Sequence, residues 1–205
     1  MERKFNCTKE QAMAYDYFAR IEKRTGRRIE LPKELKTANE IIREGSWSGV
    51  IFKGPTGSGT LTYANLMAKE LNAPVFQLSL TSNTHLEDFY RSKTFSEPIE
   101  KGGFLIIDGI EFCHESIEKM LESWFLWTLP GQKLEKPKLD DLLDIPEYTM
   151  SPNFVLVLLL DSDYWEQRTN IMSILWFVMY PEFVVPYDIP PFAVPDDIHT
   201  EEGEE

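Results

Sequence analysis

The sequence predicts an α/β fold in which a parallel sheet of five strands lies between two layers of helices. Short apolar runs alternate along the chain with segments of helical periodicity. Residues 104–107 and 154–160 are apolar throughout, which is typical of strands that are buried on both faces of a parallel sheet. A glycine-rich segment connects the first predicted strand to the helix that follows it.

The N-terminal residues 1–48 predict a linker made of two helices. Residues 8–24 form the first helix, because Thr8 and Gln11 occupy the two positions of a capping box and apolar residues follow at helical spacing. Gly26 ends this helix. The second helix is expected over residues 32–44, with Pro32 near its start.

The core is predicted to extend over residues 49–187. Its strands are expected at residues 50–52, 75–78, 104–108, 154–160 and 183–185. Helices are expected between these strands, at residues 61–71, 84–91, 114–126 and 163–179. Residues 128–153, rich in Pro, Lys and Asp, predict a long loop or a hairpin insertion, and residues 188–205 predict a disordered acidic tail.

Charge and composition exclude several classes of protein. The chain of 205 residues carries a net charge of −13, divided into +3 over residues 1–50 and −16 over the rest. An acidic body repels nucleic-acid phosphate, so we expect no direct binding to nucleic acid. The sequence shows neither a membrane span nor a signal peptide, and its two cysteines suggest no disulfide framework. We therefore expect an intracellular, cytoplasmic protein without membrane contact.

A glycine-rich loop, Gly-Pro-Thr-Gly-Ser-Gly-Thr-Leu over residues 54–61, stands between a predicted strand and a helix. Glycines let several backbone N–H groups point at one anion, and the helix N-terminus adds a positive field. We therefore predict a phosphate-binding loop, although a tight turn without a ligand remains the alternative. The predicted contacts are Gly54, Pro55, Thr56, Gly57, Ser58, Gly59, Thr60, Leu61 and Thr62.

Two side chains of the consensus phosphate loop are missing from this loop. The consensus has Lys and then Ser or Thr after the last glycine, where this chain has Thr60 and Leu61. The lysine reaches the β- and γ-phosphates, and the hydroxyl binds Mg²⁺. Thr62 comes one residue late, and because a helix turns about 100° per residue its hydroxyl is expected to point elsewhere. Binding of ATP and Mg²⁺ should therefore be weak.

The predicted strand at residues 104–108 ends in Asp108, and this segment resembles a Walker B strand. With the loop, it makes residues 8–187 similar to the AAA+ family of P-loop ATPases, and residues 78–89 resemble its dynein, midasin and MoxR-like branch. The resemblance implies the three-layer sandwich of P-loop NTPases, with Asp108 as the Mg²⁺ ligand if nucleotide binds. The alternative for Asp108 is a strand-end aspartate that caps a loop.

The chain departs from the AAA+ pattern at further positions. The catalytic glutamate that usually follows the aspartate is replaced by Gly109, and Glu111, a weak substitute, is expected to point away from the site. Asp161 stands where the family's sensor usually has Asn or Thr, unless Ser162 serves in a shifted register. Arg168, the one arginine after residue 108, is expected too early for the arginine finger. The small helical lid domain of the family is expected to be absent.

These departures favour one function and leave a second open. Phosphoryl transfer depends on positioned charge, so a chain that lacks these groups should not hydrolyse ATP efficiently. We expect a degenerate AAA+ domain, a pseudo-ATPase that acts as an interaction or scaffold module for a protein partner, such as other AAA+ subunits. The alternative is a divergent module that binds Mg-ATP and hydrolyses it only when a partner supplies a lid or an arginine finger.

Overall fold

A computed structural model describes residues 2–12, 15–26, 28–46, 48–55, 57–127, 131–133, 147–161 and 182–184. Its centre is a sheet in the order β2-β3-β4-β1-β5, in which every neighbouring pair is parallel. The strands are β1 Gly49–Gly54, β2 Val75–Ser79, β3 Gly103–Asp108, β4 Phe154–Asp161 and β5 Glu182–Val184. The predicted α/β fold with a parallel sheet is therefore confirmed.

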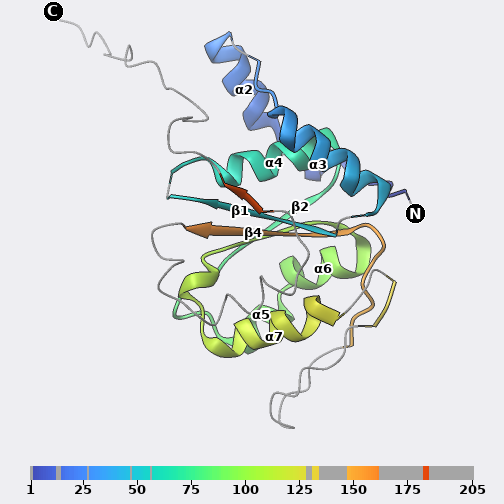
Figure 1. Cartoon of the computed structure of the whole chain (residues 1–205), viewed down its shortest axis with the longest axis vertical. Coiled ribbons are helices and arrows are strands. Elements are labelled where there is room, and N and C mark those ends of the chain that lie inside the picture. The colour runs from blue at the N-terminus through green and yellow to red at the C-terminus, as the bar shows by residue number, and fades with distance from the viewer. Residues whose placement is uncertain are drawn as a thin grey trace, which may run out of the picture.

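Helices cover both faces of the sheet, so the molecule has three layers (Figure 1). One layer contains α2, α3 and α4, and the opposite layer contains α5, α6 and α7. The helices are α1 Lys9–Ala12, α2 Asp16–Thr25, α3 Lys33–Glu44, α4 Thr60–Glu70, α5 Leu86–Arg91, α6 Lys93–Lys101 and α7 Glu115–Trp127, with a short 3₁₀ turn, η2, at Ile110–Phe112.

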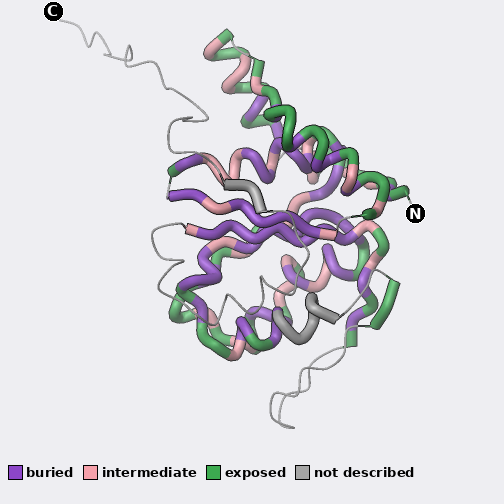
Figure 2. Tube along the Cα trace, in the orientation of Figure 1, coloured by how far each residue is buried: buried purple, intermediate pink, exposed green. Residues whose placement is uncertain are grey.

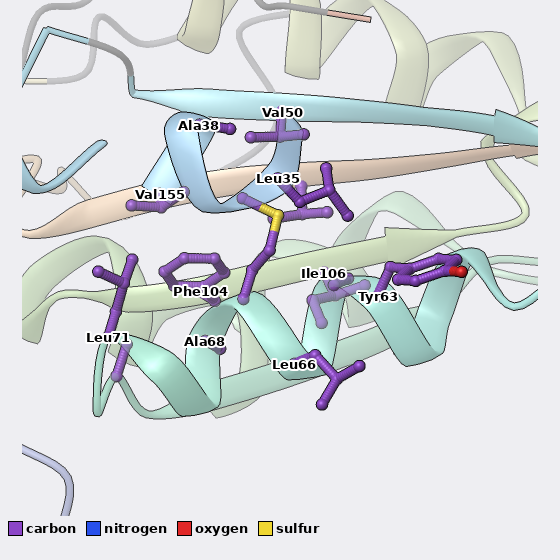
Figure 3. Packing of buried hydrophobic residues seen from close by; sticks show 14 of the residues in the cluster. Leu35, Ala38, Val50, Tyr63, Leu66, Ala68, Leu71, Phe104, Ile106 and Val155 are labelled. Atoms are coloured by element: carbon purple, nitrogen blue, oxygen red, sulfur yellow. The ribbon is translucent and has the colours of Figure 1, made fainter. Parts of the chain in front are cut away.

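Side chains of the central strands alternate between two cores, one on each face of the sheet. On β3, Phe104 and Ile106 pack towards α2, α3 and α4, whereas Leu105 and Ile107 pack towards α5, α6 and α7. Figure 2 shows that burial continues along these strands, and Figure 3 shows Phe104 and Ile106 among side chains of α3 and α4. Burial on both faces explains why these strands are apolar throughout.

The N-terminal helices begin and end much as the sequence predicts. The Thr8 N–H donates to Gln11 Oε1 at 3.0 Å, and the Gln11 N–H donates to Thr8 Oγ1 at 3.2 Å, so the capping box is confirmed. Gly26 ends α2 with φ of 65°. The predicted helix over residues 8–24 is described as two pieces, α1 and α2, because residues 13 and 14 lie outside the described part. Phe18 of α2 lies in the same core as the sheet.

On the opposite face the structure corrects the prediction for residues 84–101. The helix predicted from residue 84 begins at Leu86 and is preceded by His85, while Thr84 Oγ1 accepts from the Thr81 N–H at 2.9 Å. Helix α6 was not predicted from the sequence, because Pro98 in its interior is typical of a helix break. Ser92 caps this helix by accepting from the Thr94 N–H at 3.2 Å.

Several predictions cannot be compared with the structure over their full length. Within residues 128–153, Lys133 and Thr149 form an isolated antiparallel bridge. The predicted helix at residues 163–179 and the tail at residues 188–205 lie outside the described residues, as do Ser162 and Arg168. No helix in the described part of the chain is long and apolar enough to span a membrane.

The buried side chain of Arg3 connects the N-terminal segment to the sheet through hydrogen bonds. The Arg3 guanidinium donates to the carbonyl oxygens of Pro152 and Ile42, each at 2.8 Å, and to Ser48 Oγ at 3.0 Å. The Arg3 N–H also donates to the carbonyl of Arg43 at 2.7 Å. This side chain therefore joins the end of α3 to the segments that precede β1 and β4.

We expect Arg3→Ala to lower the free energy of unfolding by roughly 2–4 kcal/mol, because buried carbonyl groups lose charged donors. Urea unfolding followed by circular dichroism measures the change. Lys4→Ala is the matched control, because Lys4 is the exposed neighbour of Arg3. Equal effects of the two substitutions would show that Arg3 does not anchor the N-terminus.

Candidate functional site

A cavity of about 660 Å³ lies at the carboxyl ends of the parallel strands. It is lined by Gly54, Pro55, Gly57, Gly59, Thr60, Leu61, Thr62, Ser79, Leu80, Asp108, Gly109, Glu111, Phe112, Leu159, Leu160 and Asp161. Open parallel α/β sheets bind their ligands at this edge, where loops and helix N-termini converge. The cavity is therefore the candidate functional site.

The glycine-rich loop folds back on itself as a phosphate loop requires. Gly57 and Gly59 have φ of 85° and 91°, a region that other residues adopt only with strain. The Ser58 N–H donates to the Pro55 carbonyl at 3.0 Å and closes the turn, and Gly59 leads directly into α4. The first N–H groups of α4 belong to residues that line the cavity, so the positive end of this helix faces the site.

The structure brings together most residues of the predicted phosphate site. Thr62 is also among the residues that line the cavity. Ser58 does not line the cavity: its buried Oγ would lie 2.5 Å from a Cβ added to Gly54, and it has no hydrogen-bond partner among the described residues. Only glycine fits at residue 54 without displacing that side chain. Thr56 lies outside the described residues.

No basic side chain lines the cavity among the described residues. At the position of the consensus lysine, Thr60 has its Cγ2 3.3 Å from where a Cβ on Gly54 would lie. This short side chain ends in a methyl and a hydroxyl group, so it supplies no charge for a phosphate. Lys53 precedes the loop on β1 and is not among the lining residues.

Three carboxylates converge on the cavity instead. Asp108 and Asp161 come from the ends of β3 and β4, which are neighbours in the sheet, and Glu111 comes from η2. The Asp161 N–H donates to Glu111 Oε1 at 3.2 Å. The expectation that Glu111 points away from the site is therefore wrong. The sequence signal that could have placed Glu111 there is its position just after the strand that ends in Asp108.

The surroundings of Asp108 and Glu111 disfavour the charged forms of these two side chains. Burial raises the pKa of Asp108, and the charge of Asp161 raises it further against the lowering effect of the Gly109 N–H. Burial also raises the pKa of Glu111; backbone N–H groups of Glu111 and Asp161 lower it, and the charges of Asp108 and Asp161 raise it. The site therefore already resists negative charge.

The backbone at Gly109 leaves no room for a side chain at this position. Gly109 has φ of 76°, and an added Cβ would lie 2.4 Å from the Leu80 carbonyl oxygen. This close approach is fixed by a hydrogen bond of 2.7 Å from the Leu80 N–H to the Asp108 carbonyl. A glutamate cannot occupy this position unless the backbone moves.

Comparisons with known proteins support the fold. No protein-family model matches the chain, and no curated protein matches it. Two mutant structures of RuvB from Thermotoga maritima are similar to it, each with 21% sequence identity and a TM-score of 0.50. Both alignments cover 75% of this chain, and they cover 42% and 46% of the RuvB chains. The chain thus spans less than half the length of the structures it matches.

At this level of identity the similarity concerns the fold alone. The chain therefore shares the α/β fold of the matched part of these RuvB structures. The finer resemblance to the dynein, midasin and MoxR-like branch is not supported by these similarities.

Two glycine substitutions separate backbone strain from steric conflict. A Cβ added to Gly57 meets nothing within 4 Å, so Gly57→Ala should cost only the strain of a left-handed backbone. We expect it to lower the free energy of unfolding by about 1–2 kcal/mol. Gly109→Ala should cost clearly more, because its Cβ also meets the Leu80 carbonyl oxygen. Chemical denaturation measures both costs, and similar values would refute the steric conflict.

Glu111→Gln should stabilise the protein in a pH-dependent way. As pH rises above the ordinary value of 4.5, unfolded chains lose the Glu111 proton before folded chains do, because the folded-state pKa is raised. Folding stability therefore falls until the pH passes the folded-state pKa. The glutamine removes this penalty and keeps an oxygen for the Asp161 N–H.

The advantage of Glu111→Gln in urea midpoint should be largest at pH 8 and shrink on acidification. Glu40→Gln is the control, because Glu40 is an exposed glutamate of α3 outside the cavity. An advantage that stays constant from pH 8 to pH values below the ordinary value of 4.5 would contradict a raised pKa of Glu111.

Proposed function

We propose that this chain is a degenerate AAA+ ATPase-like domain, a pseudo-ATPase that is impaired in nucleotide binding and acts as an interaction or scaffold module for a protein partner. The observation that carries this proposal is the charge of the cavity. Its described lining has three carboxylates, Asp108, Glu111 and Asp161, and no basic side chain.

Electrostatics argue against tight binding of a triphosphate in this cavity. The N-terminus of α4 and the loop N–H groups attract phosphate, but a helix terminus contributes only about 0.3–1 kcal/mol at an exposed site. Loss of the lysine contact costs a few kcal/mol, which corresponds to a hundredfold or more in affinity. Three carboxylates beside the phosphates add repulsion to this loss.

The chemistry of hydrolysis is also poorly supported. Position 109 cannot hold the glutamate that polarises the attacking water, and Glu111 Oε1 already accepts from the Asp161 N–H. Asp161 adds a negative charge where the AAA+ sensor has an uncharged polar side chain. We therefore expect no efficient ATP hydrolysis by the isolated chain, because phosphoryl transfer depends on positioned positive charge and an oriented water.

One observation favours the second function, a module that binds Mg-ATP weakly and hydrolyses it with the help of a partner. Gly57 and Gly59 have the left-handed conformations that a phosphate loop requires, and the N-terminus of α4 faces the cavity. Asp108 lines the same cavity and would be the Mg²⁺ ligand. A bound Mg²⁺ would offset part of the carboxylate charge, so this function requires binding that depends on Mg²⁺.

Calorimetric titration with ATP and ADP distinguishes the two functions. We expect no measurable binding to the unmodified chain at micromolar nucleotide, with or without Mg²⁺. The double variant Thr60→Lys with Leu61→Thr should gain affinity by roughly a hundredfold, because it restores the phosphate contact and the Mg²⁺ hydroxyl. Micromolar, Mg²⁺-dependent binding to the unmodified chain would overturn the pseudo-ATPase proposal in favour of the alternative.

A third variant tests whether the carboxylates contribute to the impairment. Adding Asp161→Asn to the double variant should raise ATP affinity further, because one repulsive charge is removed from the cavity. Asp88→Asn, at an exposed position on α5 outside the cavity, is the matched control. If both substitutions leave the affinity of the double variant unchanged, the acidic lining does not oppose nucleotide.

A further inference from the structure

The buried carboxylate of Glu111 has an unsatisfied oxygen. Glu111 is 6% exposed, and while Oε1 accepts from the Asp161 N–H, Oε2 has no hydrogen-bond partner in the described part of the chain. A buried polar atom without a partner destabilises the folded state, and a charged one does so more strongly. Because Glu111 lines the cavity, a donor bound there is the direct way to satisfy this oxygen.

The sign of the charge around Glu111 determines what kind of donor fits. Asp108 and Asp161 line the same cavity, and their charges act on Glu111. A neutral donor would satisfy the oxygen but leave the mutual repulsion of the three carboxylates. A cation would donate to the oxygen and would also reduce the repulsion between the carboxylates. Charge-assisted hydrogen bonds are, in addition, roughly twice as strong as neutral ones.

The size and lining of the cavity favour an organic cation over a bare metal ion. Among the described residues, no group of three or more His, Cys, Asp or Glu side chains is arranged to hold a metal ion. The cavity volume of about 660 Å³ is that of a small-molecule site. Its apolar lining residues include Leu61, Leu80, Phe112, Leu159 and Leu160. Such side chains suit an alkyl stem that carries a charged head.

The N-terminus of α4 opposes a cation, but with the smaller charge. A helix terminus is equivalent to roughly half a positive charge, whereas the lining has three carboxylates. The cationic head therefore belongs beside Glu111, Asp108 and Asp161.

We propose that the cavity binds a guanidinium or ammonium group carried on an apolar stem, with Glu111, Asp108 and Asp161 as its acceptors. The chemistry is shared by the arginine and lysine side chains of a protein partner and by free alkyl cations. The inference rests on the proposed function, because a cavity that holds Mg-ATP is not free for this ligand.

Nuclear magnetic resonance titration of the whole ¹⁵N-labelled chain tests the proposal. The probes are butylguanidinium, its neutral analogue butylurea, and an uncharged-ended pentapeptide of four glycines with a central arginine. Butylguanidinium should shift the amide signals of Gly54, Gly57, Gly59 and Gly109, which line the cavity, with a dissociation constant on the order of millimolar. Butylurea should shift them little. Equal shifts with both probes would overturn the proposal.

Variants identify the acceptors. Glu111→Gln and Asp161→Asn should each weaken butylguanidinium binding at least tenfold, whereas Glu40→Gln should bind like the unmodified chain. Unchanged thermal midpoints and amide spectra verify that each variant is folded. If Glu111→Gln does not fold, binding to Asp161→Asn tests the site. Unchanged binding in the folded acceptor variants would refute the site.

The pentapeptide distinguishes the two sources of the cation. Tighter binding of the peptide than of butylguanidinium supports a side chain of a protein partner, and weaker binding supports a free alkyl cation. The ATP titration is read separately. If the chain binds neither ATP nor butylguanidinium, this inference is overturned but the proposed function is not. If the chain binds ATP in the micromolar range, the proposed function is overturned.

Discussion

The parallel pairing of β3, β4 and β1 is the constraint on which the rest of the structure depends. These strands are buried on both faces, so their side chains must be apolar along almost the whole length. Polar groups can appear only where the strands end. Parallel pairing puts all of these ends at one edge, and it brings Asp108 and Asp161 beside the loop that follows Gly54. The cavity and its charge follow from this arrangement.

Much of the fold could be predicted because the signals are local and periodic. The apolar runs predicted the strands, and Thr8 with Gln11 predicted a capping box that the structure contains. The helix α6 was missed because Pro98 suggests a break, and this proline is buried within a nine-residue helix. Tertiary packing outweighs the low helix propensity of proline there, and no single-residue signal reveals such packing.

The sequence predicted where the site lies in the fold, but it predicted the arrangement of the side chains there only in part. The resemblance to a Walker B strand placed Asp108 near the loop, but it could not orient Glu111. The position of Glu111 depends on the 3₁₀ turn after Gly109 and on a hydrogen bond to Asp161, a residue 50 positions away in the sequence. Contacts over such a distance are decided by the whole sheet. As a result, the glycine-rich loop and the three carboxylates line the same cavity.

The close approach of Gly109 to Leu80 has an evolutionary consequence. Any substitution at position 109 adds a Cβ that collides with the Leu80 carbonyl oxygen in a left-handed backbone. A side chain at this position therefore requires a change in the path of the chain after β2 as well as in the residue after β3. Selection acting on single substitutions meets a barrier there, so the backbone keeps glycine at this position.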